Sequence, residues 1–143
     1  MSNPIFRIWG ARFLIGIVIF FNLECALVFI LTPHLYIAGF ELTGIPGKVM
    51  VQGLGILFLM WNVPYISALI SPVANRLSLY EALIMQTIGL IGESLLLVTL
   101  PSGYQTLKNS ALRFILFDGA GLFTLLWAAW LVRGFWHTKL AGE

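Results

Sequence analysis

The chain has 143 residues, of which 59% are apolar and only 10% are charged. A soluble domain carries about 25% charged residues. This composition therefore excludes a water-soluble globular protein and indicates an integral membrane protein surrounded largely by lipid. A formal net charge of +2 without any basic run argues against nucleic acid as a partner. The length suits one transmembrane domain that covers residues 1–143.

Four apolar runs follow one another along the chain. Each has about 20 residues, the length that spans a hydrocarbon core of about 30 Å. They predict transmembrane helices at residues 13–31, 49–70, 80–100 and 112–132. The first run follows Arg7 and Arg12 and is longer than the roughly 7–15 residues of a signal-peptide core, so we expect it to be retained.

The links between the runs predict how the helices are arranged. Residues 72–79 and 101–111 are short links that permit only antiparallel neighbours. The link at 33–48 is longer and apolar, and is typical of a short segment lying at the membrane interface. The predicted fold is all-α, an antiparallel four-transmembrane-helix bundle with a short interfacial segment after helix 1.

Lys and Arg near the membrane ends predict the orientation of the bundle. With the N-terminus inside, five of them lie on the inner side and three on the outer side. This bias favours cytoplasmic N- and C-termini. The inner set is Arg7, Arg12, Arg76, Arg133 and Lys139, and the outer set is Lys48, Lys108 and Arg113.

Polar side chains inside the apolar runs are the only feature that points to function. A carboxyl group in hydrocarbon is costly unless it is neutral, paired or next to water. Counting at 1.5 Å per residue places the three carboxyls about 10 Å below the outer interface. The predicted intramembrane cluster, binding or structural, consists of Glu24, Gln52, Glu93, Arg113 and Asp118, with Asn62 and Gln86 as secondary members.

Helical spacing places several of these polar groups on helix faces that also carry small residues. Small and polar residues recur every three or four positions, which places them on one side of a helix. Such stripes let helices approach closely and bond across the interface. The stripes are Gln52, Gly55, Leu59 and Asn62; Gln86, Gly89 and Glu93; and Asp118, Gly121 and Leu125, followed by Ala128 or Ala129. Helix 1 fits this arrangement less well.

The charges of the cluster do not balance. Three carboxyls face one guanidinium, so we expect at least one carboxyl to be protonated at pH 7. Arg113 is expected to pair across helices with Glu93 or Glu24. Two interpretations stay open: the polar groups fix helix packing, or they line a cavity that binds a polar headgroup or passes a proton.

The sequence contains no recognisable catalytic constellation. The two histidines, His34 and His137, are expected at opposite membrane faces, where they cannot share a metal ion. Cys25 is the only cysteine, and no phosphate-binding loop or Ser-His-Asp set is present. We therefore predict no catalytic residue, no metal site and no required cofactor, although contact with a quinone or a pigment is left open.

Three short stretches carry a family resemblance. They are Pro33-His34-Leu35-Tyr36, the turn Phe40-Glu41-Leu42-Thr43-Gly44, and Gln52-Gly53-Leu54-Gly55 at the start of the second run. With the four-helix layout, these stretches resemble DoxX-like small bacterial membrane proteins over most of the chain. The resemblance implies a bacterial cytoplasmic membrane. Some members are associated with quinone-linked sulfur oxidation or membrane redox complexes, but a lone cysteine does not support thiol redox chemistry.

Two functional hypotheses follow from these observations. The first is a non-catalytic accessory or structural subunit that packs against a larger membrane complex. Its partners would be membrane lipid, other membrane subunits or further copies of itself. The alternative is a quinone-linked or proton-transferring membrane protein that uses Glu24, Glu93 and Asp118. A carrier or channel ranks last, because no inverted repeat is present.

Overall fold

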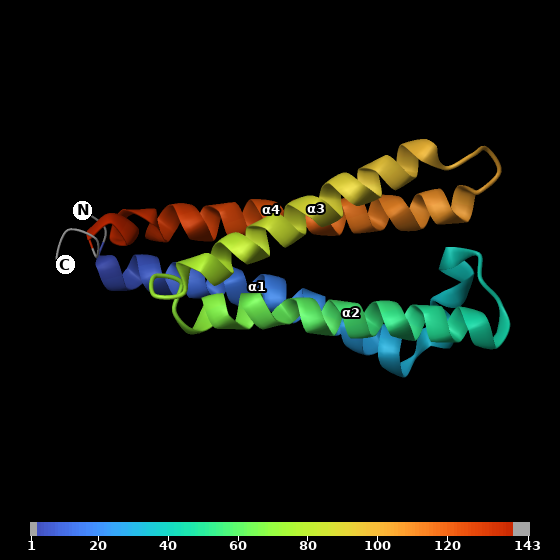
Figure 1. The fold of residues 1–143 in the computed structure, drawn as a ribbon, viewed down its shortest axis with the longest axis horizontal. Helices are drawn as coiled ribbons and strands as arrows, with labels where there is room; N and C mark the ends of the chain where they lie inside the picture. Colours follow the sequence, from blue (N-terminus) through green and yellow to red (C-terminus); the bar gives the residue numbers. More distant parts are fainter. Residues whose placement is uncertain (1–2, 139–143) are drawn as a thin grey trace.

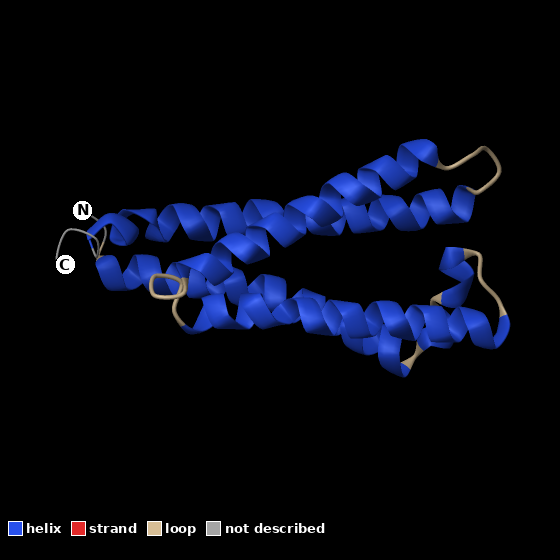
Figure 2. Cartoon of the chain, viewed as in Figure 1, coloured by secondary structure: helices blue, strands red, loops and turns tan. Residues whose placement is uncertain are grey.

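The computed structural model describes residues 3–138 and contains four long helices (Figures 1 and 2). They are α1 (Pro4–Leu31), α2 (Gly44–Ile70), α3 (Arg76–Thr99) and α4 (Gln105–Thr138). Two 3-10 turns, η1 (Pro33–Leu35) and η2 (Ile37–Phe40), follow α1. All four helices are long and apolar enough to cross a membrane. The predicted all-α, antiparallel four-helix fold is confirmed, and the chain is an integral membrane protein with four candidate spans.

The helices are longer than the apolar runs predicted. The ends at Leu31 and Ile70 agree, but α1, α2 and α4 begin 9, 5 and 7 residues earlier than expected, and α4 continues to Thr138. Hydropathy marks only the part of a helix that lies in hydrocarbon, whereas backbone hydrogen bonding continues through polar flanks. At the start of α1, for example, Asn3 Oδ1 accepts a hydrogen bond from the Ile5 backbone N–H (3.0 Å), and Pro4 takes the first helical position.

Each helix packs against two neighbours. Contacts join α1 to α2, α2 to α3, α3 to α4 and α4 to α1, and in the described part of the chain the backbones of diagonal pairs do not come within 8 Å, Cα to Cα. We call the end where α1 begins and α4 finishes the termini end, and the opposite end the far end. Figure 1 shows α3 starting beside α2 at the termini end and diverging from it toward the far end.

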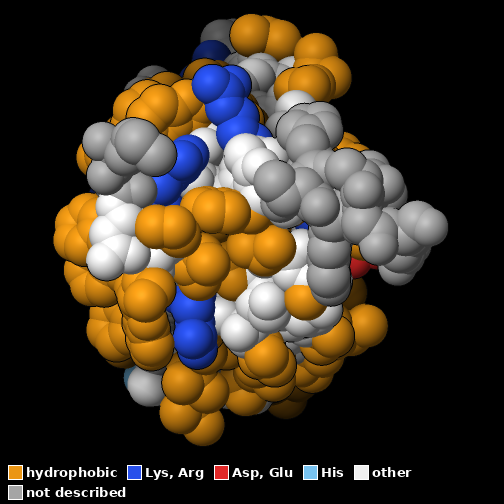
Figure 3. Space-filling view, turned by 90° about the vertical axis from the view of Figure 1, so that its left-hand side faces the viewer, with side chains coloured by type: hydrophobic (Ala, Val, Ile, Leu, Met, Phe, Trp, Pro, Cys, Tyr) orange, Lys and Arg blue, Asp and Glu red, His pale blue; other side chains and the backbone are white. Residues whose placement is uncertain are grey.

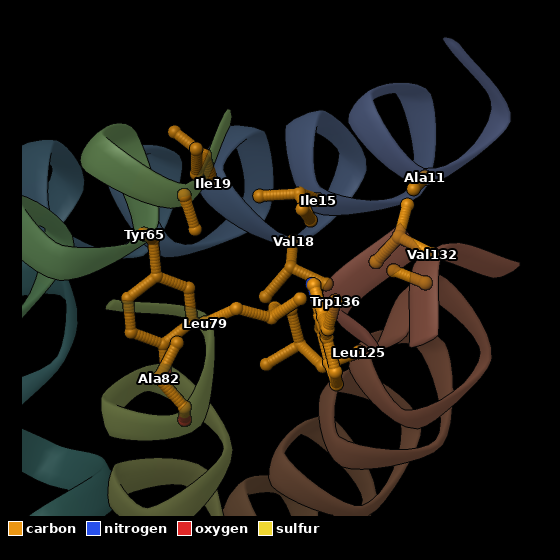
Figure 4. Packing of buried hydrophobic residues seen from close by; sticks show 12 residues of the cluster. Ala11, Ile15, Val18, Ile19, Tyr65, Leu79, Ala82, Leu125, Val132 and Trp136 are labelled. Carbon is orange, nitrogen blue, oxygen red and sulfur yellow. The ribbon is translucent and has the colours of Figure 1, made fainter. Parts of the chain in front are cut away.

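The buried core lies in the termini half of the bundle. Its labelled members point toward one another from all four helices in Figure 4. Four residues of this core are the alanines Ala11, Ala68, Ala82 and Ala128, and small residues allow membrane helices to approach closely. The Trp136 indole N–H donates to the Pro72 carbonyl oxygen (3.2 Å), which ties the end of α4 to the α2–α3 connection.

A cluster of aromatic rings lies in the far half, between α1, α2 and α4. Phe29 is only 4% exposed, and its ring lies 4.9–6.2 Å, centroid to centroid, from the rings of Tyr36, Phe40, Phe58 and Phe114. The Ser110 hydroxyl donates to the Gly39 carbonyl oxygen (2.6 Å), which fastens η2 to α4. The segment after α1 therefore covers the far end of the α1–α4 seam.

Gly55 permits the close contact between α1 and α2, and its replacement tests this packing. A Cβ atom at Gly55 would lie 2.8 Å from both the Ala26 carbonyl oxygen and Ile30 Cγ1. We expect Gly55→Ala to lower the free energy of unfolding by about 1–3 kcal/mol, because the α1 backbone must move. Unfolding in mixed micelles, titrated with a denaturing detergent, measures the change.

Gly53 provides the matched control on the same helix. No atom lies within 4 Å of a Cβ at this position. Alanine is intrinsically preferred over glycine in a helix by about 1 kcal/mol, so Gly53→Ala should be neutral or stabilising. Equal stability of the two variants would contradict the packing described for Gly55.

Candidate functional site

A chain of hydrogen bonds joins three helices near the middle of the bundle. The Tyr65 hydroxyl of α2 lies 2.7 Å from Gln86 Oε1 of α3 and 3.2 Å from the Ala82 carbonyl oxygen, and donates its hydrogen to these acceptors. The Gln86 amide in turn donates to Asp118 Oδ1 of α4 (2.9 Å) and to the Asp118 carbonyl oxygen (3.3 Å). Tyr65 and Gln86 are 3% and 4% exposed. The interior of the bundle therefore contains a continuous polar link from α2 to α4.

Two glycines make room for the Gln86–Asp118 contact. A Cβ atom at Gly89 of α3 would overlap Asp118 Oδ2, and a Cβ atom at Gly121 of α4 would collide with the Gln86 amide. Each polar side chain thus lies in the notch left by a glycine on the facing helix. The small-and-polar stripes that the sequence predicted on these two helices face each other.

A small cavity lies beside the Asp118 carboxyl group. Its volume is about 30 Å³, which is enough for about one water molecule. All four helices line it, and no Lys or Arg does so. Its polar lining comes from Asn22, Cys25, Tyr65, Gln86 and Asp118, and its walls include the rings of Phe58, Trp61, Phe114 and Phe117.

Glu93 lies one helical turn beyond Gly89, toward the far end of α3. It is half-buried, and its Oε2 atom is buried without a hydrogen-bond partner among residues 3–138. The carboxyl groups of Glu93 and Asp118 are close enough to interact electrostatically. The structure therefore brings two of the three predicted carboxyls into one region and leaves an acceptor of Glu93 uncommitted.

Gln52 and Asn62 do not line the cavity. The Gln52 amide donates to the Ile30 carbonyl oxygen (3.1 Å) and so joins α2 to α1. Asn62 is fully buried, and its amide donates to the Phe58 carbonyl oxygen one turn earlier (2.7 Å). Its Oδ1 atom has no partner within the described residues.

Glu24 and Arg113 do not join the interior group. Glu24 is exposed on the outer side of α1, and Arg113 is exposed near the far end of α4. The expected ion pair of Arg113 with Glu93 or Glu24 does not form within residues 3–138. The depth predicted for these groups stays a prediction, and their side-chain directions keep them out of the interior group. Leu59, expected on the inner stripe of α2, is also exposed.

Tyr65, Asn22 and Cys25 are members of the site that were not predicted. Tyr65 continues the α2 stripe three residues after Asn62, and this spacing was the available signal. Asn22 lies two residues before Glu24 and points the other way, into the cavity. Within the described residues, no three His, Cys, Asp or Glu side chains are placed to share a metal ion. The side chain of His137 lies outside the described residues.

Comparison with protein-family models, with curated proteins and with solved structures finds no match to this chain. The class that the fold defines is a small integral membrane protein with four candidate spans. The DoxX-like resemblance stays a prediction.

The notch at Gly89 gives the site a direct test. Gly89→Ala would push Asp118 away from Gln86, leaving a buried amide short of an acceptor, so we expect a loss of about 1–3 kcal/mol in unfolding free energy. Gly92→Ala is the control on the same helix, since no atom lies within 4 Å of its Cβ. Thermal unfolding in detergent compares the two. A Gly89→Ala protein as stable as the Gly92→Ala protein would show that the notch is not needed.

Proposed function

We propose that the protein is a non-catalytic membrane subunit that assembles with another membrane protein through the outer side of α1. The observation that carries this proposal is the exposed carboxyl group of Glu24 within a candidate span. Glu24 belongs to an exposed row of residues with spacings of three, four or seven. We call this row the α1 outer stripe: Phe6, Trp9, Phe13, Phe20, Glu24, Leu27 and Leu31.

The depth of Glu24 favours a protein neighbour over lipid. Glu24 lies seven residues before the end of α1 at Leu31, which corresponds to about 10 Å along the helix. A charged side chain in hydrocarbon is costly, and a central carboxylate costs about 2.5–3.5 kcal/mol on insertion scales. Lipid satisfies the exposed apolar residues of the stripe, but it offers Glu24 no hydrogen-bond donor. A neighbouring transmembrane helix with a polar side chain would offer one.

The partner in this proposal is either another membrane subunit or a second copy of the chain. The remaining exposed apolar residues, including Ile88 on α3 and Ile56 on α2, would face lipid. We further infer a bacterial cytoplasmic membrane with both ends of the chain in the cytoplasm. Lys and Arg side chains gather between apolar ones on the termini end in Figure 3, which supports that orientation.

Replacement of Glu24 tests the proposed assembly. Glu24→Leu removes the polar contact and should leave the protein largely unassembled, whereas Glu24→Gln keeps hydrogen-bonding capacity and should assemble like the wild type. Mass measurement after purification from native membranes in a mild detergent gives the result.

Glu81→Leu is the matched control, because Glu81 is an exposed glutamate on α3. It should not change assembly. A wild-type protein that purifies as a monomer without a partner would overturn the proposal, as would a Glu24→Leu protein that assembles normally.

A second candidate function is proton transfer, linked to a quinone or not, at Asp118 and Glu93. The observation that favours it is the water-sized cavity beside the Asp118 carboxyl, next to the hydrogen-bonded chain through Gln86 to Tyr65. Carboxyl groups that line internal cavities of membrane proteins commonly relay protons. Glu24 would take no part, because it is exposed on the outside of the bundle.

The Asp118→Asn variant distinguishes a role of Asp118 in proton transfer from a role in helix packing. The asparagine side-chain oxygen can still accept from Gln86, so we expect the fold to be kept while proton exchange is lost. Proton uptake by liposomes containing the protein, followed with an internal pH-sensitive dye, measures the exchange. Glu81→Gln should exchange like the wild type. Unchanged proton uptake in Asp118→Asn would contradict the relay, and an unfolded variant would favour the packing role.

A further inference from the structure

A long groove follows the seam between α1 and α4. Its upper part, at the far end, has a volume of about 300 Å³ and is lined mainly by aromatic rings, including Phe29, Tyr36, Phe40 and Phe114. Its lower part has a volume of about 250 Å³ and is bordered by Ile17, Phe21, Ala120 and Thr124. Phe117 lines both parts, which therefore lie next to each other along the seam.

The groove runs parallel to α4, which is a candidate membrane span. From Arg113 at its top to Thr124 at its base, α4 advances about 16 Å. The walls below Arg113 are mainly apolar, with Asn22 and Thr124 as the polar residues of the lower part, and Glu24 is not among the residues that line either part. This shape suits a single hydrocarbon chain that enters from one leaflet.

Arg113 is the one charged side chain that lines the upper part of the groove. It is exposed and forms no ion pair within residues 3–138. The nearby Ser110 hydroxyl is already engaged with the Gly39 carbonyl oxygen. A guanidinium group has donors placed to bind phosphate oxygens in pairs, and basic pockets between transmembrane helices bind anionic headgroups.

The covered top of the groove disfavours a helix as its occupant. The residues after α1, among them Leu35, Tyr36 and Phe40, line the upper part and lie against α4. A transmembrane helix is about 10–12 Å wide with its side chains and would have to pass this segment along its whole length. A flexible acyl chain can bend beneath it.

We propose that the α1–α4 groove binds one anionic phospholipid from the leaflet opposite the termini end. Its phosphate contacts the guanidinium of Arg113, and one acyl chain lies along Phe114, Phe117 and Ala120 toward Thr124. Charge and shape together select the ligand. A neutral lipid would leave Arg113 without an anionic partner, and a soluble anion would leave the groove unfilled.

Native mass spectrometry of delipidated protein tests the proposal, with phosphatidylglycerol as the probe and phosphatidylcholine as the neutral comparison. We expect one phosphatidylglycerol to bind about fivefold more tightly than phosphatidylcholine, as about 1 kcal/mol from one basic residue gives. Arg113→Gln should abolish this preference, and Arg133→Gln, at the termini end of the same helix, should keep it. Glycerol 3-phosphate, which has no acyl chain, should not displace the lipid.

A second variant tests the chain-binding part of the groove. Ala120 is exposed and borders the lower part, so Ala120→Phe should fill the groove without disturbing the core, and should weaken binding of both lipids. Equal binding of the two lipids by the wild type would overturn the proposal. It would also be overturned by an unchanged preference in Arg113→Gln or by displacement with glycerol 3-phosphate. These outcomes do not depend on assembly through α1, since they are measured on the individual chain.

Discussion

The hydrogen bonds between Gln86 and Asp118 join α3 to α4 at the level where the packing of the bundle changes. Toward the termini end, alanines bring four helices into one tight core. Toward the far end, α3 diverges from α2 and keeps only α4 as a close neighbour along its length (Figure 1). The Gln86–Asp118 bond lies where one arrangement changes into the other, and Tyr65 extends it to α2. Because the side chains lie in glycine notches, the bond also fixes the relative position of α3 and α4 along their axes.

Much of the fold follows from the sequence, but only part of the site does. Four apolar runs of spanning length, separated by short links, leave few alternatives to an antiparallel bundle. The stripes through Gly89 and Gly121 predicted which sides of α3 and α4 come together, because small and polar residues at helical spacing have few other uses in a membrane. Periodicity describes a side of one helix, however, and does not state which neighbour that side meets.

Glu24 illustrates that limit. The sequence predicted the same depth for Glu24 as for the other carboxyls, yet Asn22 and Cys25 point into the bundle and Glu24 points out of it. Arg113 differs for another reason, since its long side chain can reach the interface instead of an interior carboxyl. Tyr65 was not predicted as a member of the site, because a tyrosine in an apolar run is usually taken as a hydrophobic packing residue. In each case the missing information was the direction of a side chain relative to its neighbours.

The Gln86–Asp118 bond also has a consequence for how the protein is made. Synthesis runs from the N-terminus, so α1 and α2 can pair early through the Gln52–Ile30 bond and the close contact at Gly55. Helix α3 cannot complete its packing before α4 is present. The acceptor for its Gln86 amide and the side chain that fills its Gly89 notch both belong to α4. The third helix therefore enters the bilayer before the acceptor for its Gln86 amide has been made, and α4, which is synthesised after it, completes both its packing and its hydrogen bonding.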